Sequence, residues 1–126
     1  MSGFDQETIE TIIKISENKQ DDEIQHDIYG VIYSLGRDAE NIEEFQYAYD
    51  KLLKLCKHMN PHVRAYSILA LSLLAGNRIV KKETVVPIIM EEWKNNKEYR
   101  GTIKDAVDDL NERLKWDINL ENGFSD

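Results

Sequence analysis

Apolar residues in this chain recur at steps of three and four, the spacing that places them along one side of a helix. The strict alternation of apolar and polar positions that marks a half-buried strand is missing. Only 2 prolines and 6 glycines occur in the 126 residues. The pattern predicts an all-α fold with helices over about Gln6–Asn18, Asp22–Leu35, Ile42–Met59, Pro61–Gly76, Lys82–Asn95 and Lys97–Lys115.

Several of the predicted helix ends carry residues suited to their positions. Pro61 occupies a first helical position, where its missing N–H needs no partner. Gly36 is expected to end the second helix in a left-handed conformation, and Pro87 to kink or split the fifth. Polar residues that can cap a helix come directly before five of the helices. These predicted caps are Asp5, Asp21, Asn41, Asn60 and Asn96.

The second, fourth and sixth predicted helices superpose on one another without gaps, at offsets of 39 and 36 residues. A period of this size is typical of stacked helix pairs, in which each pair buries its apolar stripe against the next. We therefore expect a single domain over 1–126, an α-α superhelix of three stacked antiparallel helix pairs. The expected pairs cover about 5–36, 41–76 and 82–116, and the tail 117–126 either caps the stack or is loose.

The segment 60–71, with the sequence NPHVRAYSILAL, resembles the second helix of a HEAT repeat. In that family the helix opens with a capping residue, often a proline, and continues with Val-Arg and then small and aliphatic residues. The match is good at 60–76, fair at 96–110 and weak at 21–35, where Gln25 replaces the arginine. In HEAT repeats this arginine commonly pairs with an acidic residue of a neighbouring repeat. The resemblance thus implies structural roles for Arg64 and Arg100, next to the helix start at Asn60 and Pro61.

The chain is acidic, with a formal charge of −8 from 24 acidic and 16 basic residues. Binding to a phosphate backbone depends on clustered lysines and arginines, and the longest basic run is the pair Lys81–Lys82. This argues against a nucleic-acid ligand. An acidic surface attracts basic partners and speeds their association, although the charge is also explained by solubility alone.

The sequence gives no sign of secretion or of a membrane span. The N-terminus lacks the basic and apolar regions of a secretory signal. The longest apolar stretch, Ile68–Ala75, is far shorter than the roughly 20 residues a membrane helix needs and is interrupted by Ser72. We expect a cytoplasmic protein that has no membrane partner.

Residues capable of catalysis or metal binding do not converge in the sequence. Cys56 lies in a helical apolar pattern and is expected to be a core cysteine. His58 and His62 have the spacing of a metal-binding pair, but the helix break at 60–61 separates them, and His26 is remote. CxxC, glycine-rich phosphate loops and GxSxG elbows are missing. We expect no metal, no cofactor and no enzymatic activity.

Four carboxylates share one face of the sixth predicted helix, because they are spaced by three, four and seven residues. They form either a solvated face, balanced by nearby basic residues, or a docking surface for a basic partner. A pair of catalytic carboxylates would need a second wall across a cleft, which nothing in the sequence indicates. These residues are Asp105, Asp108, Asp109 and Glu112.

Tyr29 and Tyr33 lie one turn apart on the second predicted helix, outside its apolar stripe. In HEAT stacks the second helices line the concave side. Tyrosine is enriched in the centres of protein interfaces. These two tyrosines are therefore either partner contacts or ordinary packing.

In its size, charge and helical-repeat build the chain resembles the immunity proteins carried beside bacterial contact-dependent growth-inhibition toxins. Several such toxins are basic nucleases. This resemblance implies a protein that binds and neutralises a cognate toxin, through the four carboxylates and the two tyrosines. The alternative is a generic HEAT-type scaffold or adaptor. HEAT-like DNA glycosylases are larger and carry basic grooves, unlike this chain, and a HEAT-like bilin lyase fragment is a further remote alternative.

Overall fold

The computed structural model describes residues 5–17, 26–76 and 80–120, and the regular secondary structure of these ranges is entirely helical. The predicted all-α class is thereby confirmed. No helix among these residues is long and apolar enough to cross a membrane. The helices are α1 (Gln6–Ser16), α2 (His26–Arg37), α3 (Ile42–Leu55), α4 (Pro61–Leu74), α5 (Lys82–Asn95), the short 3-10 helix η2 (Lys97–Tyr99) and α6 (Arg100–Leu114).

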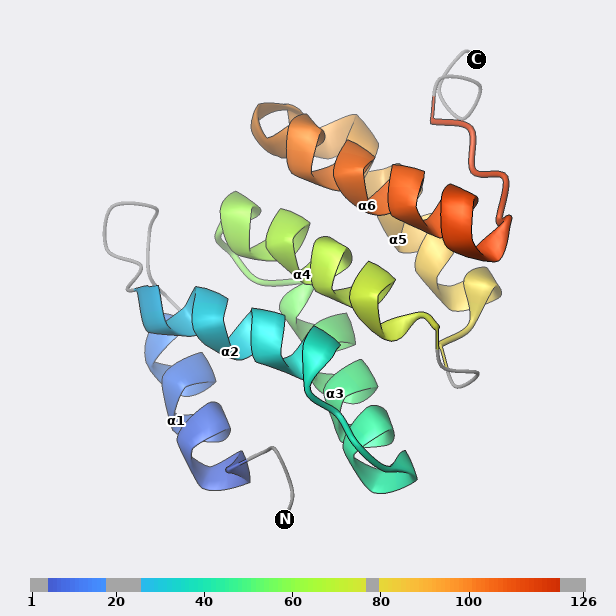
Figure 1. Cartoon of the computed structure of the whole chain (residues 1–126). Coiled ribbons are helices and arrows are strands. Elements are labelled where there is room, and N and C mark those ends of the chain that lie inside the picture. The colour runs from blue at the N-terminus through green and yellow to red at the C-terminus, as the bar shows by residue number, and fades with distance from the viewer. Residues whose placement is uncertain (1–4, 18–25, 77–79, 121–126) are drawn as a thin grey trace.

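The helices form two rows (Figure 1). α2, α4 and α6 lie side by side, with α4 in contact with both of the others. α1, α3 and α5 form the second row, in which α1 contacts α2, α3 contacts α4 and α5 contacts α6. α4 is therefore the central helix, and it is also the one with the largest number of buried residues. This arrangement leaves one side of α2, α4 and α6 facing away from the second row.

Side-chain caps start α1, α3 and α4 at the predicted positions. The N–H of Thr8 donates to Asp5 Oδ1 at 3.3 Å, and the N–H of Glu44 donates to Asn41 Oδ1 at 2.9 Å. Asn60 Oδ1 accepts from the N–H groups of His62 and Val63, at 2.8 and 3.1 Å. Each bond satisfies an N–H that the first helical turn leaves without a partner.

The sequence predicted that Gly36 ends α2, and this prediction is wrong. Gly36 lies inside the helix and is buried. A Cβ atom at this position would come within 2.6 Å of the carbonyl oxygen of Ala70 on α4. The glycine is required by the close approach of two helix backbones, and not by a left-handed turn. The predicted start of this helix, near Asp22, lies outside the described residues.

Two other predicted boundaries need correction. α3 ends at Leu55 and not near Met59, because the backbone turns after it through two bonds between residues three apart. Of the two alternatives for Pro87, the split is not found, because α5 runs through Pro87 as one helix. Asn96 does not cap a helix with its side chain, which donates to the carbonyl oxygen of Pro61 at 2.7 Å and so reaches the start of α4. η2 precedes α6 at this end.

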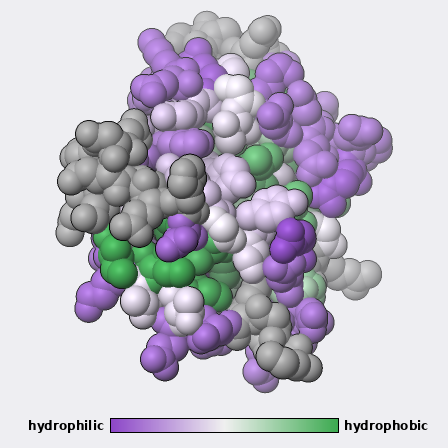
Figure 2. Space-filling model, turned by 60° about the vertical axis from the view of Figure 1, so that its left-hand side comes forward, coloured by the Kyte–Doolittle hydropathy of each residue, from purple (hydrophilic) through white to green (hydrophobic). Residues whose placement is uncertain are grey.

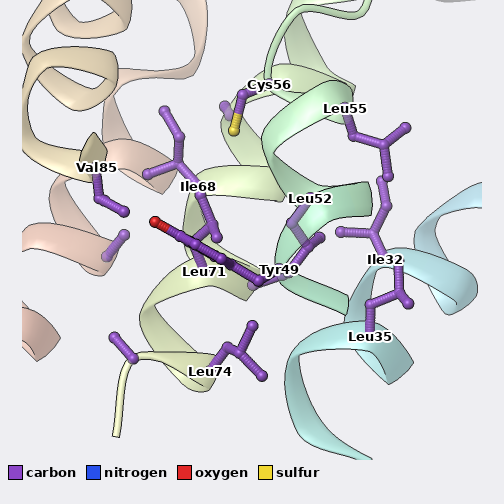
Figure 3. Close-up of a cluster of buried hydrophobic side chains, with 14 of the residues drawn as sticks. Ile32, Leu35, Tyr49, Leu52, Leu55, Cys56, Ile68, Leu71, Leu74 and Val85 are labelled. Atoms are coloured by element: carbon purple, nitrogen blue, oxygen red, sulfur yellow. The ribbon is translucent and has the colours of Figure 1, made fainter. Parts of the chain in front are cut away.

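One continuous hydrophobic core joins the two rows (Figure 3). Ile32 and Leu35 from α2 lie beside Leu52 from α3 and Leu71 from α4, and all four are fully buried. Cys56 is 6% exposed and lies at one side of this cluster. Its burial was expected from the apolar pattern around it. The core extends into α5 and α6 through Val85, Ile89, Ile103 and Leu110.

The first residues of the tail fold back against α6. Lys115 adopts the left-handed conformation that commonly ends a helix, with φ 56°. The side chain of Asn111 then binds both backbone groups of Ile118, at 2.9 and 2.7 Å, and Leu120 is buried. Of the two alternatives for the tail, residues 117–120 therefore follow the packed one. Residues 121–126 lie outside the described part of the chain.

Candidate partner-binding surface

Four aromatic rings meet on the side of α2, α4 and α6 that faces away from the second row. Tyr29 comes from α2, His62 and Tyr66 come from α4, and Tyr99 comes from η2. We call these four residues the aromatic cluster. Each of them is half-buried, so that part of every ring is open to solvent.

The rings of the aromatic cluster contact one another across three helical elements. The His62 ring is stacked on Tyr99, with 4.5 Å between centroids and 4° between planes. The Tyr29 ring lies 4.7 Å from His62 and 5.5 Å from Tyr66, the latter edge to face. The edge contact of Tyr29 with Tyr66 is one of the favourable geometries for aromatic pairs. The contacts connect positions 29, 62, 66 and 99, which are brought together only by the packing of α4 between α2 and α6.

Tyr33, the second predicted tyrosine, is not among the ring contacts of the cluster. It lies one turn after Tyr29 and is 40% exposed. The guanidinium of Arg37 lies over its ring, 4.8 Å from the centroid. Arg37 also pairs with Asp38 at 2.6 Å. Tyr33 thus extends the aromatic surface along α2, with a cation already over its ring.

The four predicted carboxylates lie on α6, and two of them form ion pairs along the helix. Asp108 pairs with Lys104 at 2.9 Å, and Asp109 pairs with Arg113 at 2.8 Å. Hydrogen bonding to Asp108 raises the pKa of Lys104. Asp105 and Glu112 form no ion pair within the described residues. The ridge of four carboxylates is therefore partly neutralised and keeps its unpaired charge at these two positions.

Three members of this ridge stay exposed with the described part of the tail in place, namely Asp105, Asp108 and Glu112. Asp109 is half-buried, because its partner Arg113 reaches α4 and donates to the carbonyl oxygen of Ser72. This contact orients the Asp109–Arg113 pair toward α4. The ridge begins with Asp105, six residues or roughly 9 Å along the helix from Tyr99.

The two predicted structural arginines have different environments. Arg64 Nε donates to both carboxylate oxygens of Glu92 on α5, at 2.8 and 3.0 Å. Arg64 Nη1 also donates to the carbonyl oxygens of His58 and Met59. This is an ion pair between α4 and the next helix, of the kind that the HEAT resemblance implies. The arginine links three segments of the chain.

Arg100 has no acidic partner among the described residues. Its Nε donates to the carbonyl oxygen of Trp93 at 2.8 Å, and its guanidinium lies 4.6 Å from the centroid of the Trp93 ring. The acidic partner of Arg64 comes from the helix that follows α4, whereas no helix follows α6 in the described chain. Arg100 therefore contacts Trp93 of α5 where Arg64 contacts an acidic residue.

The groups that could carry chemistry are held apart. Burial raises the pKa of the Cys56 thiol to about 12, with Glu92 adding to the shift, so the thiol is protonated at neutral pH. His58 is buried beside Ser16, while His62 belongs to the aromatic cluster. Within the residues that the structure describes, no three His, Cys, Asp or Glu side chains come together in a way that could hold a metal ion.

Sequence reasoning had selected Tyr29 but missed His62, Tyr66 and Tyr99. Tyr66 was interpreted only as part of the repeat motif, His62 was also considered as a metal ligand, and Tyr99 was not singled out. A usable signal was nevertheless present. His62 and Tyr66 are one turn apart and lie outside the apolar stripe of α4, as Tyr29 and Tyr33 do on α2.

Comparisons of the chain with protein families, with curated protein sequences and with solved structures find no match. The function must therefore be inferred from the surface of the chain itself.

Proposed function

We propose that this chain is a protein-binding module, built as a HEAT-like stack of three antiparallel helix pairs. Its partner would bind to the side of α2, α4 and α6 that faces away from the second row. The observation that carries this proposal is the aromatic cluster, because its rings come from three elements and all remain partly exposed.

An exposed aromatic cluster of this kind has the physical properties of an interface centre. Tyrosine combines a large apolar area with a polar tip and is among the residues that dominate binding energy in interfaces. The rings of Tyr29, His62 and Tyr99 are already held in place by mutual contacts. Little conformational entropy would therefore be lost when a partner covers them.

The charge of α6 indicates what kind of partner fits. Asp105 and Glu112 keep unpaired negative charge on α6, with Asp105 the nearer of the two to Tyr99, and Asp108 and Asp109 add charge that is paired only within the helix. A partner with basic residues around an apolar centre would complement this surface and would associate faster at low salt. The chain as a whole, at −8, favours the same class of partner.

Because the chain resembles immunity proteins, we propose that its partner is a toxin domain. This domain would have a basic surface and act in the cytoplasm. In this proposal the chain neutralises the toxin by occupying its active surface and has no catalytic role and no cofactor of its own. A HEAT-type adaptor with another basic partner is the alternative, and it would use the same surface.

A pull-down from the native cell at low salt, with mass spectrometry of the bound proteins, tests the proposal. We expect one basic protein, and we expect its loss when Asp105, Asp108, Asp109 and Glu112 are all changed to serine. The loss follows from removing the complementary charge. Recovery of a basic protein that is not a toxin would favour the adaptor.

A matched control changes four exposed carboxylates of the second row to serine, so that the net charge of the two variants is equal. We expect it to retain the partner. These residues are Glu43 and Asp50 on α3 and Glu83 and Glu91 on α5. Equal binding by both variants, or a partner without basic character, would contradict the proposal.

A further inference from the structure

A shallow apolar groove runs between α1 and α2, on the side of this helix pair that is remote from α4. It has a volume of about 370 Å³. Its floor is formed by Ile9 and Ile12 from α1 and by Gly30 and Val31 from α2. Figure 2, which brings the α1 and α2 side of the molecule forward, shows an apolar patch in this region. The groove shares no residue with the aromatic cluster.

Gly30 is an unusual residue for the floor of this groove. It is the fifth residue of α2, where a glycine weakens a helix relative to alanine. A Cβ atom at Gly30 would meet nothing within 4 Å, whereas one at Gly36 would collide with Ala70. Packing within the described chain therefore explains Gly36 but not Gly30. A bare backbone at the surface suits the close approach of another molecule.

Two carboxylates mark the ends of the groove. Asp5 precedes α1, and Asp27 lies in the first turn of α2, which is next to the last turn of α1 (Figure 1). Hydrogen bonds from Thr8 lower the pKa of Asp5, so its carboxylate is ionised at neutral pH. None of the described residues that line the groove is basic. A second copy of this chain, bound groove to groove, would oppose like charges, whereas a basic partner would pair with them.

We propose that this groove is a second docking site and that it binds an amphipathic helix of another protein. That helix is apolar along one side and carries a lysine or arginine at each end of its apolar stripe. Helices pack into the groove between two neighbouring helices through such stripes. The eight residues from Asp5 to Ile12 span roughly 10 Å, which corresponds to two turns of the bound helix. Its basic residues would therefore be spaced about seven positions apart.

The probe for this proposal is a synthetic fluorescent helical peptide of about 18 residues, with a leucine stripe bounded by lysines seven positions apart. A second peptide carries glutamate in place of these lysines. Fluorescence anisotropy at low salt measures the binding of each to the full chain. We expect the lysine peptide to bind and the glutamate peptide to bind at least about tenfold more weakly, because Asp5 and Asp27 repel it.

The variant Gly30→Gln places a side chain in the groove without a collision inside the chain. We expect this variant to bind the lysine peptide about tenfold or more weakly, since a filled groove cannot accept the leucine stripe. Gly101→Gln is the matched control, because Gly101 is an exposed helical glycine of α6 with equally open surroundings. We expect it to leave binding unchanged. Thermal melting followed by circular dichroism verifies that both variants fold.

The proposal is overturned if the lysine peptide fails to bind, if the glutamate peptide binds equally well, or if Gly30→Gln binds like the parent chain. Sedimentation of the chain alone provides a further test. A dimer that dissociates in the Gly30→Gln variant would assign the groove to a second copy and would also overturn the proposal. None of these results depends on the aromatic cluster or on the carboxylates of α6. Failure of the groove proposal would therefore leave the proposed function unaffected.

Discussion

Two hydrogen bonds hold His58 in one neutral tautomer. The N–H of Asn60 donates to Nδ1 at 3.0 Å, so Nδ1 carries no proton. Nε2 then carries the proton and lies 3.2 Å from the hydroxyl of Ser16, which itself donates to the carbonyl oxygen of Ile13. Burial lowers the pKa of His58 below its usual 6.5. A second proton on this ring would point at the N–H of Asn60.

This environment predicts how stability depends on pH. Between the lowered pKa and 6.5, the unfolded chain binds more protons at His58 than the folded chain does. The free energy of unfolding should therefore be highest above pH 6.5 and should fall as the pH drops through the folded-state pKa. Denaturant unfolding at several pH values above about 5, where most carboxylates remain ionised, measures the effect. We expect the free energy of unfolding of the variant His58→Gln to depend less on pH. A pKa of His58 at or above 6.5, measured by NMR, would refute the account.

Gly30 and Gly36 belong to the same helix but should respond oppositely to alanine. Gly30→Ala should stabilise the protein by about 0.5–1 kcal/mol, because alanine favours the helix and the added methyl meets nothing. Gly36→Ala should destabilise it by about 1–3 kcal/mol, because the methyl collides with the backbone of Ala70. Chemical denaturation of the two variants gives both values. Similar changes of the same sign would mean that α2 and α4 do not approach as closely as described.

Among the helices, α4 and α5 are joined by the ion pair of Arg64 and Glu92 in addition to their shared core. Glu92 is 7% exposed and accepts from Arg64, which also binds the two carbonyl oxygens at the end of the α3–α4 turn. Changing Glu92 to alanine leaves the Arg64 guanidinium without its charge partner in a partly buried site. We expect a loss of roughly 2–4 kcal/mol in the free energy of unfolding.

Lys104→Met is the control for this experiment, because the Lys104–Asp108 pair is exposed to water and surface pairs contribute little. Its unfolding curve should coincide with that of the parent chain. If Glu92→Ala were as harmless as Lys104→Met, the ion pair would not connect α4 to α5 in solution.

The bodies of the helices and the starts of α1, α3, α4 and α5 could be predicted from the sequence because they depend on local signals. Asn41 and Asn60 cap their helices by binding N–H groups two or three residues away, and the apolar stripes extend over several turns. The incorrect boundaries depend on distant contacts. Gly36 is fixed by Ala70 on another helix, and the side chain of Asn96 is drawn to Pro61. Neither contact can be found within the window of one helix.

The same distinction applies to the candidate site. The carboxylates of α6 and Tyr29 were selected because they lie outside an apolar stripe, which is a property of one helix. The aromatic cluster depends on the position of α4 along α2 and η2, and hence on three-dimensional packing. Tyr99 in particular is placed by η2, which no helical period indicates.

At the scale of the whole molecule, the two proposed docking surfaces lie on different sides of the described chain. The aromatic cluster and the α6 carboxylates face away from the second row, and the groove between α1 and α2 lies on the side remote from α4. Both combine apolar or aromatic residues with carboxylates. The carboxylates of both surfaces would favour basic partners, in addition to their effect on solubility.

Hydrogen–deuterium exchange of the chain, free and bound to the partner recovered from the native cell, tests the central claim most directly. The claim is that a basic protein binds to the side of α2, α4 and α6 that faces away from the second row. Binding should slow amide exchange in segments 27–37, 61–74 and 97–112, and should leave α3 and the middle of α5 unchanged. Slowing confined to α3 and α5, with no change around the aromatic cluster, would contradict the account.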